Sequence, residues 1–300
     1  MPSFPAHLVT RPVLERLTGE RSGVVLGAGA TAAWVDVGGF VVVITTREVP
    51  LLPNAVALGA GSGALIHPGL AAGTRARLAP GRVDLGALQV TWDPAAPPSW
   101  DPTVRVPQAV GPEAIADRAA ALRGALGGVD SHGKPPREHA TLPLRGPQQP
   151  GVGINGALDL LFRAVGERDP GLAAGAARGL LGRGPGLTPE GDDLLAAVAG
   201  TLAVLGPAAG WGGSVLDGFL TALVEPARER TTALSATLLE LAARGQLAEA
   251  AGRLLDLGPD GEAAWPAALA RLERLGHGSG RAYAAGITAT ASLLASGRAG

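Results

Sequence analysis

The sequence AWVDVGGFVVVIT, residues 33–45, decides the fold of the N-terminal part of the chain. Its two arms, residues 33–37 and 40–45, are rich in the β-branched and aromatic side chains that are typical of β-strands. Gly38 and Gly39 stand between the arms, and a Gly-Gly pair suits the tight turn of a two-residue hairpin. The stretch therefore predicts a β-hairpin.

Further short runs of this kind flank the hairpin, with Gly and Pro between them. They lie at residues 24–26, 54–58, 64–67, 74–78, 82–85 and 87–92. Many short strands separated by turn residues predict a β-sandwich or a β-barrel. We assign this β-rich domain to residues 1–108.

A Pro-rich passage, residues 93–112, reads as an ordered connector, and beyond it the hydrophobic period becomes helical. The predicted helices cover residues 113–126, 155–166, 170–181, 189–205, 213–226, 232–244, 246–256, 262–275 and 279–296. The prediction is an α+β protein in which a larger all-helical domain, residues 109–300, follows the sandwich-like or barrel-like domain.

Composition excludes several classes of protein. Of the 300 residues, 46% are apolar and 17% are charged, which is too apolar for a disordered chain. The formal net charge of −1 offers no basic face for nucleic acid. The chain has no cysteine, so disulfides, thiolate metal sites and a cysteine nucleophile are excluded.

The uncharged stretch 194–216 is long enough to span a bilayer. It is interrupted by Gly206-Pro207 and by the glycines of residues 210–213, so we interpret it as two helices joined by a turn. The N-terminus lacks the apolar core of a signal peptide. We expect a soluble, cytoplasmic protein with no membrane partner.

Three patterns that are typical of nucleotide or metal sites are not interpreted as such sites in this sequence. Residues 24–32, VVLGAGATA, match a dinucleotide-binding fingerprint, but a hairpin follows where that site needs a helix. Lys134 is the only lysine, and we do not expect a Walker loop. His132 and His139, in the polar loop 127–151 that we expect to be the most mobile segment, are interpreted as solvated rather than as metal ligands.

The most informative stretch is GRGPGLTPEGDD, residues 182–193, between two predicted helices. Thr188 is a good N-cap, Pro189 suits the first helical position, and three acidic residues follow in the first turn, so ordinary helix initiation is one explanation.

Three features favour a ligand site instead. The alternating glycines allow backbone N–H groups to face an anion, and Arg183 can pair with the same anion. Gly191 costs about 1 kcal/mol inside a helix, which close approach of a ligand or of another backbone would explain. Asp192 and Asp193 can hold Mg²⁺ together with phosphate and water. Both explanations stay open at this point.

Two later stretches resemble the first. Residues 228–235 place arginines before a hydroxyl-rich helix start, where Thr231 or Thr232 is the N-cap; capping with solvated arginines is the simpler explanation. In residues 276–281, Ser279 is the expected N-cap and His277 can titrate near neutral pH, although a Gly-rich turn with a packed histidine is the alternative. Three such helix starts could converge on one anion.

Taken together, these stretches resemble the family of the AllH-type subunit of oxamate carbamoyltransferase. The resemblance lies in residues 184–193, 231–235 and 276–280, and in residues 52–56 and 92–94 of the N-terminal half. The departures from the family pattern are Pro53, Ala282 in place of an acidic residue, and Glu190 in place of a small one.

The resemblance implies a role in purine-derived nitrogen catabolism, where a complex of several subunits converts oxalurate and phosphate to oxamate and carbamoyl phosphate. We expect this chain to bind phosphate, carbamoyl phosphate or an oxalurate-like anion in its helical domain. The alternatives are a non-catalytic assembly or regulatory subunit and a metal-dependent hydrolase. The predicted catalytic residues are Asp192, Asp193 and His277, with the two aspartates also as ligands of Mg²⁺, and the predicted substrate-binding residues are Arg183, Gly184, Gly186, Thr188, Arg230, Thr231, Thr232, Ser235, Ser279 and Gly280.

Overall fold

The computed structural model describes the chain except for residues 62, 68, 108–109, 128–153, 274–277 and 298–300. By its internal contacts the chain forms two compact units. The first joins Met1–Pro102 with Gln246–Glu249, and the second joins Thr103–Gly245 with Ala250–Gly300. The sequence places the boundary at residue 108, and the contacts divide the chain after Pro102.

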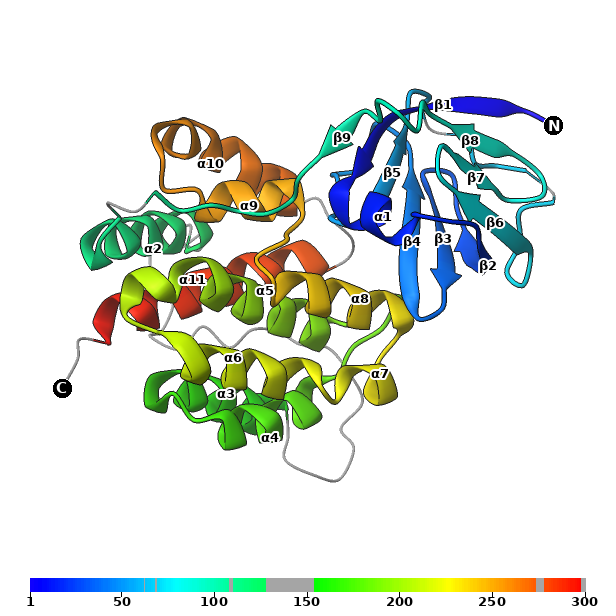
Figure 1. Cartoon of the computed structure of the whole chain (residues 1–300). Helices are drawn as coiled ribbons and strands as arrows, with labels where there is room; N and C mark the ends of the chain where they lie inside the picture. Colours follow the sequence, from blue (N-terminus) through cyan, green and yellow to red (C-terminus); the bar gives the residue numbers. More distant parts are fainter. Residues whose placement is uncertain (62, 68, 108–109, 128–153, 274–277, 298–300) are drawn as a thin grey trace, which may run out of the picture. The chain divides into compact units, whose positions relative to one another are not determined.

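The first unit is a closed β-barrel. Its elements are β1 (Ser3–Thr10), α1 (Arg11–Arg16), β2 (Arg21–Ala28), β3 (Ala32–Val37), β4 (Phe40–Thr45), β5 (Ala55–Leu58), β6 (Arg75–Ala79), β7 (Arg82–Asp84), β8 (Gln89–Thr91) and β9 (Ser99–Trp100). The strands follow the order β5-β4-β3-β2-β6-β7-β8-β1, and β5 also pairs with β1, which closes the barrel (Figure 1). The short β9 adds to β1. The predicted barrel-like domain is therefore confirmed.

The predicted hairpin lies in the middle of this sheet. β3 and β4 are antiparallel, with Val37 opposite Phe40, and Gly38 and Gly39 have positive φ angles of 63° and 85°. Such angles are those of a type I′ turn, in which glycine avoids the steric cost of a Cβ. Asp36 accepts a 2.7 Å hydrogen bond from the backbone N–H of Gly39.

Two parts of the strand prediction are wrong. Residues 64–67 begin in a turn, in which the N–H of Ile66 donates to Gly63, a glycine with a φ of 91°. β1 and α1 were not predicted, although the alternating burial of β1 and the proline in the first turn of α1 are ordinary signals.

The second unit is helical. Its elements are α2 (Pro112–Leu126), α3 (Ile154–Glu167), α4 (Pro170–Leu180), α5 (Glu190–Leu205), the 3₁₀ turn η1 (Pro207–Ala209), α6 (Gly213–Val224), α7 (Ala227–Arg230), α8 (Ala233–Ala242), α9 (Glu249–Leu255), α10 (Pro259–Glu273) and α11 (Ser279–Ser296). Each predicted helix is present with ends shifted by a few residues, whereas η1 and the short α7 were missed.

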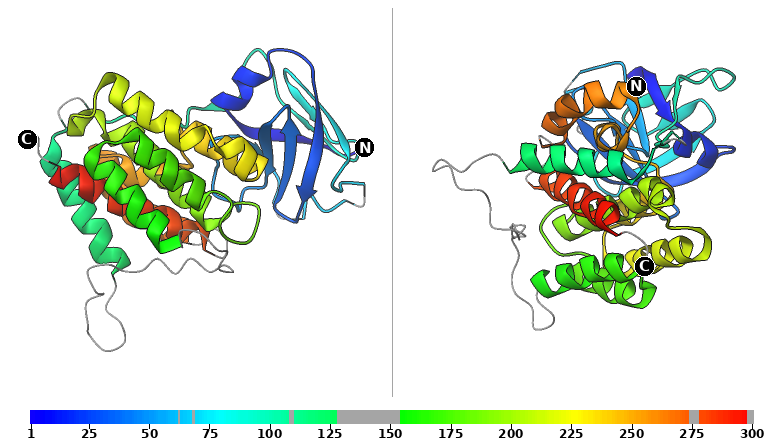
Figure 2. Two further views of the ribbon diagram at one scale, coloured as in Figure 1. Left: turned by 90° about the horizontal axis from the view of Figure 1, so that it is seen from below. Right: turned by 90° about the vertical axis from the view of Figure 1, so that its left-hand side faces the viewer.

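α5 is the central helix of this unit. Almost all of its residues are buried, and it packs against α11 and α8 (Figures 1 and 2). A Cβ added to Gly286 of α11 would lie 2.7 Å from the Cβ of Ala197, so small residues bring these two helices close together. The uncharged stretch 194–216 divides as expected into α5, η1 and α6, and none of the described helices is both long and apolar enough to cross a membrane.

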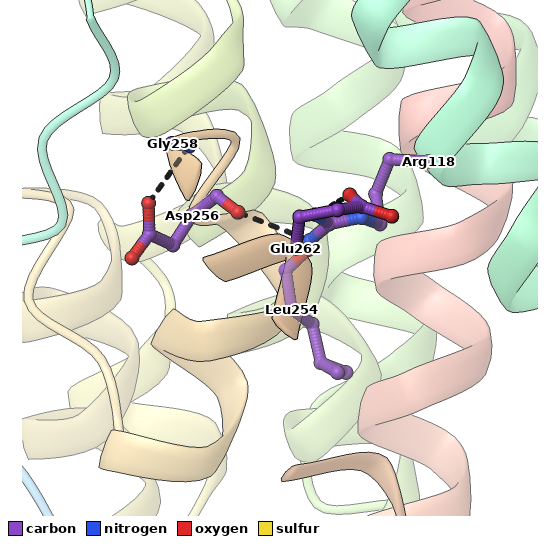
Figure 3. A network of polar contacts seen from close by, with 5 residues as sticks. All are labelled: Arg118, Leu254, Asp256, Gly258 and Glu262. Carbon is purple, nitrogen blue, oxygen red and sulfur yellow. Dashed lines mark hydrogen bonds and ion pairs between the residues drawn. The ribbon is translucent and has the colours of Figure 1, made fainter. Parts of the chain in front are cut away.

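A buried arginine joins α2 to the α9–α10 region (Figure 3). The guanidinium group of Arg118 donates to the carbonyl oxygens of Leu254 at 2.9 Å and Asp256 at 3.1 Å, and to the Glu262 carboxylate at 2.7 Å. The Arg118 side chain is 3% exposed, whereas that of Glu262 is 73% exposed.

Candidate functional site

The loop between α4 and α5 depends on glycine for its path. Gly182, Gly184 and Gly186 have φ angles of 72°, 122° and 97°, a region that other residues rarely adopt. A Cβ on Gly182 would lie 2.6 Å from the carbonyl oxygen of Arg230, and one on Gly184 would lie 2.8 Å from the backbone nitrogen of Glu190. Gly182 and Gly184 thus allow tight backbone packing, whereas nothing lies within 4 Å of a Cβ added to Gly186.

Tight packing against neighbouring backbone also explains the glycine at position 191. A Cβ at this position would overlap the carbonyl oxygen of Leu180, the last residue of α4. The N–H of Gly191 also donates to the carbonyl of Arg183 at 3.0 Å. Of the two explanations that the sequence left open, close approach of another backbone is therefore the one observed.

Asp192 ties the loop to the segment before α8. One of its carboxylate oxygens accepts a 2.8 Å hydrogen bond from the N–H of Gly182, and the other accepts from the Thr231 hydroxyl. Asp192 is 2% exposed. Burial raises its pKa, although hydrogen bonds from Thr231, Gly182 and Ser235 oppose this effect.

The three Gly-rich and hydroxyl-rich stretches meet in space. The Thr232 hydroxyl donates to the carbonyl of Leu187 at 2.7 Å, and it also caps α8 by accepting from the N–H of Ser235 at 3.1 Å. The hydroxyl groups of Thr188 and Ser279 are 3.2 Å apart. Residues 182–193, 231–235 and 279 therefore form one group, which we call the three-stretch cluster.

Two predicted N-caps are wrong. Pro189 holds the N-cap position of α5, which begins at Glu190, and the hydroxyl of Thr188 is directed to Ser279 instead. Gly278 holds the N-cap position of α11, so Ser279 is its first helical residue, and its hydroxyl lies within 3.4 Å of the Thr188 carbonyl. In both cases a contact between two stretches replaces a local cap.

Asp193 is the most perturbed acid of the cluster. It is 6% exposed, and its Oδ2 atom has no hydrogen-bond partner among the described residues. Burial raises its pKa to about 7; a hydrogen bond with Ser279 opposes the rise, and the charges of Asp192 and Glu190 add to it. Burial and the charge of Asp193 raise the pKa of Tyr283 in turn. An acid with a pKa near neutrality is suited to proton transfer.

The remaining predicted residues differ in their surroundings. Arg183 is half-buried, and its Nε donates to the Gly179 carbonyl at 3.3 Å. Arg230 is exposed. A Cβ on Gly280 would overlap the Leu272 carbonyl, so this glycine also serves packing. His277, like His132, His139 and Lys134, lies outside the described residues.

Glu190 and Gly278 are not among the predicted site residues. The Glu190 carboxyl group occupies the space where a Cβ on residue 278 would stand, and its Oε2 atom is buried without a partner in the described part of the chain. The spacing of Glu190 and Asp193, three residues apart on a helix, is the signal that could have paired them. Within the described ranges, no group of three or more His, Asp or Glu side chains is arranged to hold a metal ion.

Comparison with known protein families gives a match, and it lies in the helical unit. Residues 180–291 match the family described as oxamate carbamoyltransferase subunit AllH. The matched region begins at the end of α4 and ends within α11, so it contains the whole three-stretch cluster. Neither curated proteins nor solved structures give a match. The resemblance predicted from the sequence is thus confirmed for residues 180–291, which match the AllH subunit family of oxamate carbamoyltransferase.

Proposed function

We propose that this chain is a subunit of an oxamate carbamoyltransferase-like complex that converts oxalurate and phosphate to oxamate and carbamoyl phosphate. The family match supports membership of a multi-subunit assembly. The helical unit binds the small anion, whether phosphate, carbamoyl phosphate or an oxalurate-like molecule, at the three-stretch cluster.

One observation carries this proposal: Asp193, a buried carboxyl group with an oxygen that has no partner among the described residues, lies where separate helix starts meet. Helix N-termini and glycine-rich loops present N–H groups to anions. In the proposed site the loop at Gly184 and Gly186 supplies such groups, and Arg183 and Arg230 neutralise the negative charge.

The reaction needs a proton to be moved. A phosphate oxygen attacks the terminal carbamoyl carbon of oxalurate, the bond from this carbon to the oxamate nitrogen breaks, and that nitrogen takes a proton while phosphate loses one. A carboxyl group with a pKa of about 7 can accept and return a proton at neutral pH. Asp193 is our candidate for this role, and His277 stays a predicted catalytic residue.

A second candidate function is a non-catalytic assembly subunit. It is favoured by the packing of Gly182, Gly184 and Gly191, because tight contacts with neighbouring backbone account for these glycines without a ligand. The two functions differ in whether the lone chain binds a substrate.

Calorimetric titration of the purified chain with carbamoyl phosphate, in EDTA and then in Mg²⁺, separates the candidates. We expect binding that Arg183→Met weakens, because Arg183 neutralises the charge of the anion, and that Asp217→Asn, a change at an exposed carboxylate of α6, leaves intact. No binding in either buffer supports the assembly subunit. Metal-dependent turnover of a phosphoester would support the hydrolase instead.

A further inference from the structure

Two carboxylate oxygens in the first turn of α5 are buried without a partner. They are Oε2 of Glu190 and Oδ2 of Asp193, and neither has a hydrogen bond to any described residue. A buried polar atom without a partner is costly, and a buried carboxylate more so, because it loses water and gains nothing in return. Such atoms point to a ligand that the chain itself does not supply.

The two side chains extend toward adjacent residues at the start of α11. The Glu190 carboxyl group stands against Gly278, and Asp193 interacts with the hydroxyl of Ser279. Residues three apart on a helix share one face, which places the two carboxyl groups on the same side of α5. The geometry thus pairs Glu190 with Asp193.

Asp192 differs from this pair. Both of its oxygens accept hydrogen bonds from the protein, one from Gly182 and one from Thr231. It has no buried oxygen without a partner. The sequence pairs Asp192 with Asp193 as cation ligands, whereas the hydrogen bonds favour Glu190 as the partner of Asp193.

We propose that Glu190 and Asp193 together bind a divalent cation of the Mg²⁺ or Mn²⁺ type. Carboxylate oxygens are the ligands that these hard cations prefer, and Mg²⁺ is commonly held by one or two carboxylates with water completing its shell. The hydroxyl groups of Thr188 and Ser279 lie beside the pair and leave the donor set rich in oxygen.

The cation also resolves a conflict of charge in the proposed function. An anion bound at the three-stretch cluster would lie near the carboxylates of Glu190, Asp192 and Asp193, and like charges repel strongly where water is excluded. A divalent cation on Glu190 and Asp193 reverses the local sign. It also holds Asp193 ionised, so in the cation-bound chain the proton transfer of the proposed reaction falls to the other predicted catalytic residue, His277. The site for the cation does not depend on which reaction the complex performs.

The test is titration of the whole chain with Mn²⁺ alone, without any anion, followed by electron paramagnetic resonance and calorimetry at about pH 8, above the pKa of Asp193. We expect Glu190→Gln and Asp193→Asn each to weaken Mn²⁺ binding about tenfold or more. Asp217→Asn is the matched control and should bind Mn²⁺ like the wild type. Circular dichroism shows whether each variant is folded, and Glu190→Gln, at a half-buried position, keeps the test valid if Asp193→Asn unfolds.

Absence of Mn²⁺ binding to the folded wild type at about 1 mM overturns the proposal, and so does binding that neither variant weakens. The result is separable from that of the proposed function. Binding of carbamoyl phosphate in EDTA without Mn²⁺ binding would leave the proposed function and remove the cation site. Binding of Mn²⁺ without binding of carbamoyl phosphate would support the cation site and contradict the proposed function.

Discussion

The backbone N–H of Gly182 donates a 2.8 Å hydrogen bond to Oδ1 of Asp192, ten residues further along the chain. The other oxygen of the same carboxylate accepts from the Thr231 hydroxyl. One buried side chain thus connects the loop after α4, the first turn of α5 and the segment before α8. Asp192 therefore has a structural role, which does not depend on any ligand that the neighbouring residues bind.

Asp192→Ala is therefore expected to destabilise the protein. The change leaves the Gly182 N–H and the Thr231 hydroxyl without their acceptor, which typically costs about 1–3 kcal/mol. Urea unfolding followed by the helical circular-dichroism signal measures the loss. Asp217→Ala, at an exposed carboxylate of α6, controls for the removal of charge. Equal stability of the two variants would show that the hydrogen bonds of Asp192 contribute nothing to folding.

Gly191→Ala is expected to destabilise strongly. Helix propensity alone favours alanine by up to about 1 kcal/mol, but the new Cβ would overlap the carbonyl oxygen of Leu180 and force α4 and α5 apart. Gly124→Ala is the matched control, since Gly124 lies in α2, is exposed, and has nothing within 4 Å of an added Cβ. This control should gain stability. The explanation from backbone packing fails if the two glycine variants change the unfolding midpoint in the same direction.

The pKa of Asp193 predicts a dependence of stability on pH. Its value is about 7 in the folded protein against 3.8 for an unperturbed aspartate. Between these values the folded chain keeps a proton that the unfolded chain has released, so the contribution of Asp193 is most favourable below pH 4 and is lost as pH rises to 7. Above that pH the contribution no longer changes.

The comparison that isolates this effect is between the wild type and Asp193→Asn, unfolded by urea in EDTA at about pH 5 and at about pH 8. An amide does not titrate, so the variant should lose less stability than the wild type over this interval, by an amount on the order of 1 kcal/mol or more. Parallel curves for the two proteins would mean that Asp193 is ionised in the folded state throughout the range.

Local patterns made a large part of the fold predictable. The Gly-Gly turn between residues 37 and 40 and the longer helices from α2 to α11 depend on nearby residues, which the sequence displays directly. Closure of the barrel depends instead on β1 pairing with β5, where Val9 lies opposite Val56. Nothing in the local pattern of either strand selects the other, because pairing over this separation is decided by how the whole sheet curves.

The meeting of the three stretches was predictable from the sequence, but the contacts between them were not. Hydroxyl-rich helix starts indicated that three stretches would meet, and Thr188, Thr231, Thr232 and Ser279 do lie together. The hydrogen bond between Thr188 and Ser279 joins residues that are 91 positions apart, and it displaces the local caps that each side chain would otherwise form. Local capping preference is worth only about 1 kcal/mol, so such a tertiary contact can override it.

Removal of the Arg118 guanidinium is expected to weaken the helical unit (Figure 3). Arg118→Met keeps the length of the side chain but leaves the carbonyl oxygens of Leu254 and Asp256 without their donor, at a cost of about 2 kcal/mol or more. Glu262→Gln should change stability by less than about 1 kcal/mol, because an ion pair with one exposed partner is weak in water. Thermal unfolding of the two variants tests this order. If Glu262→Gln were the more damaging change, the ion pair rather than the backbone carbonyls would be what Arg118 stabilises, and the pKa of Glu262, which Arg118 lowers, would then be linked to folding.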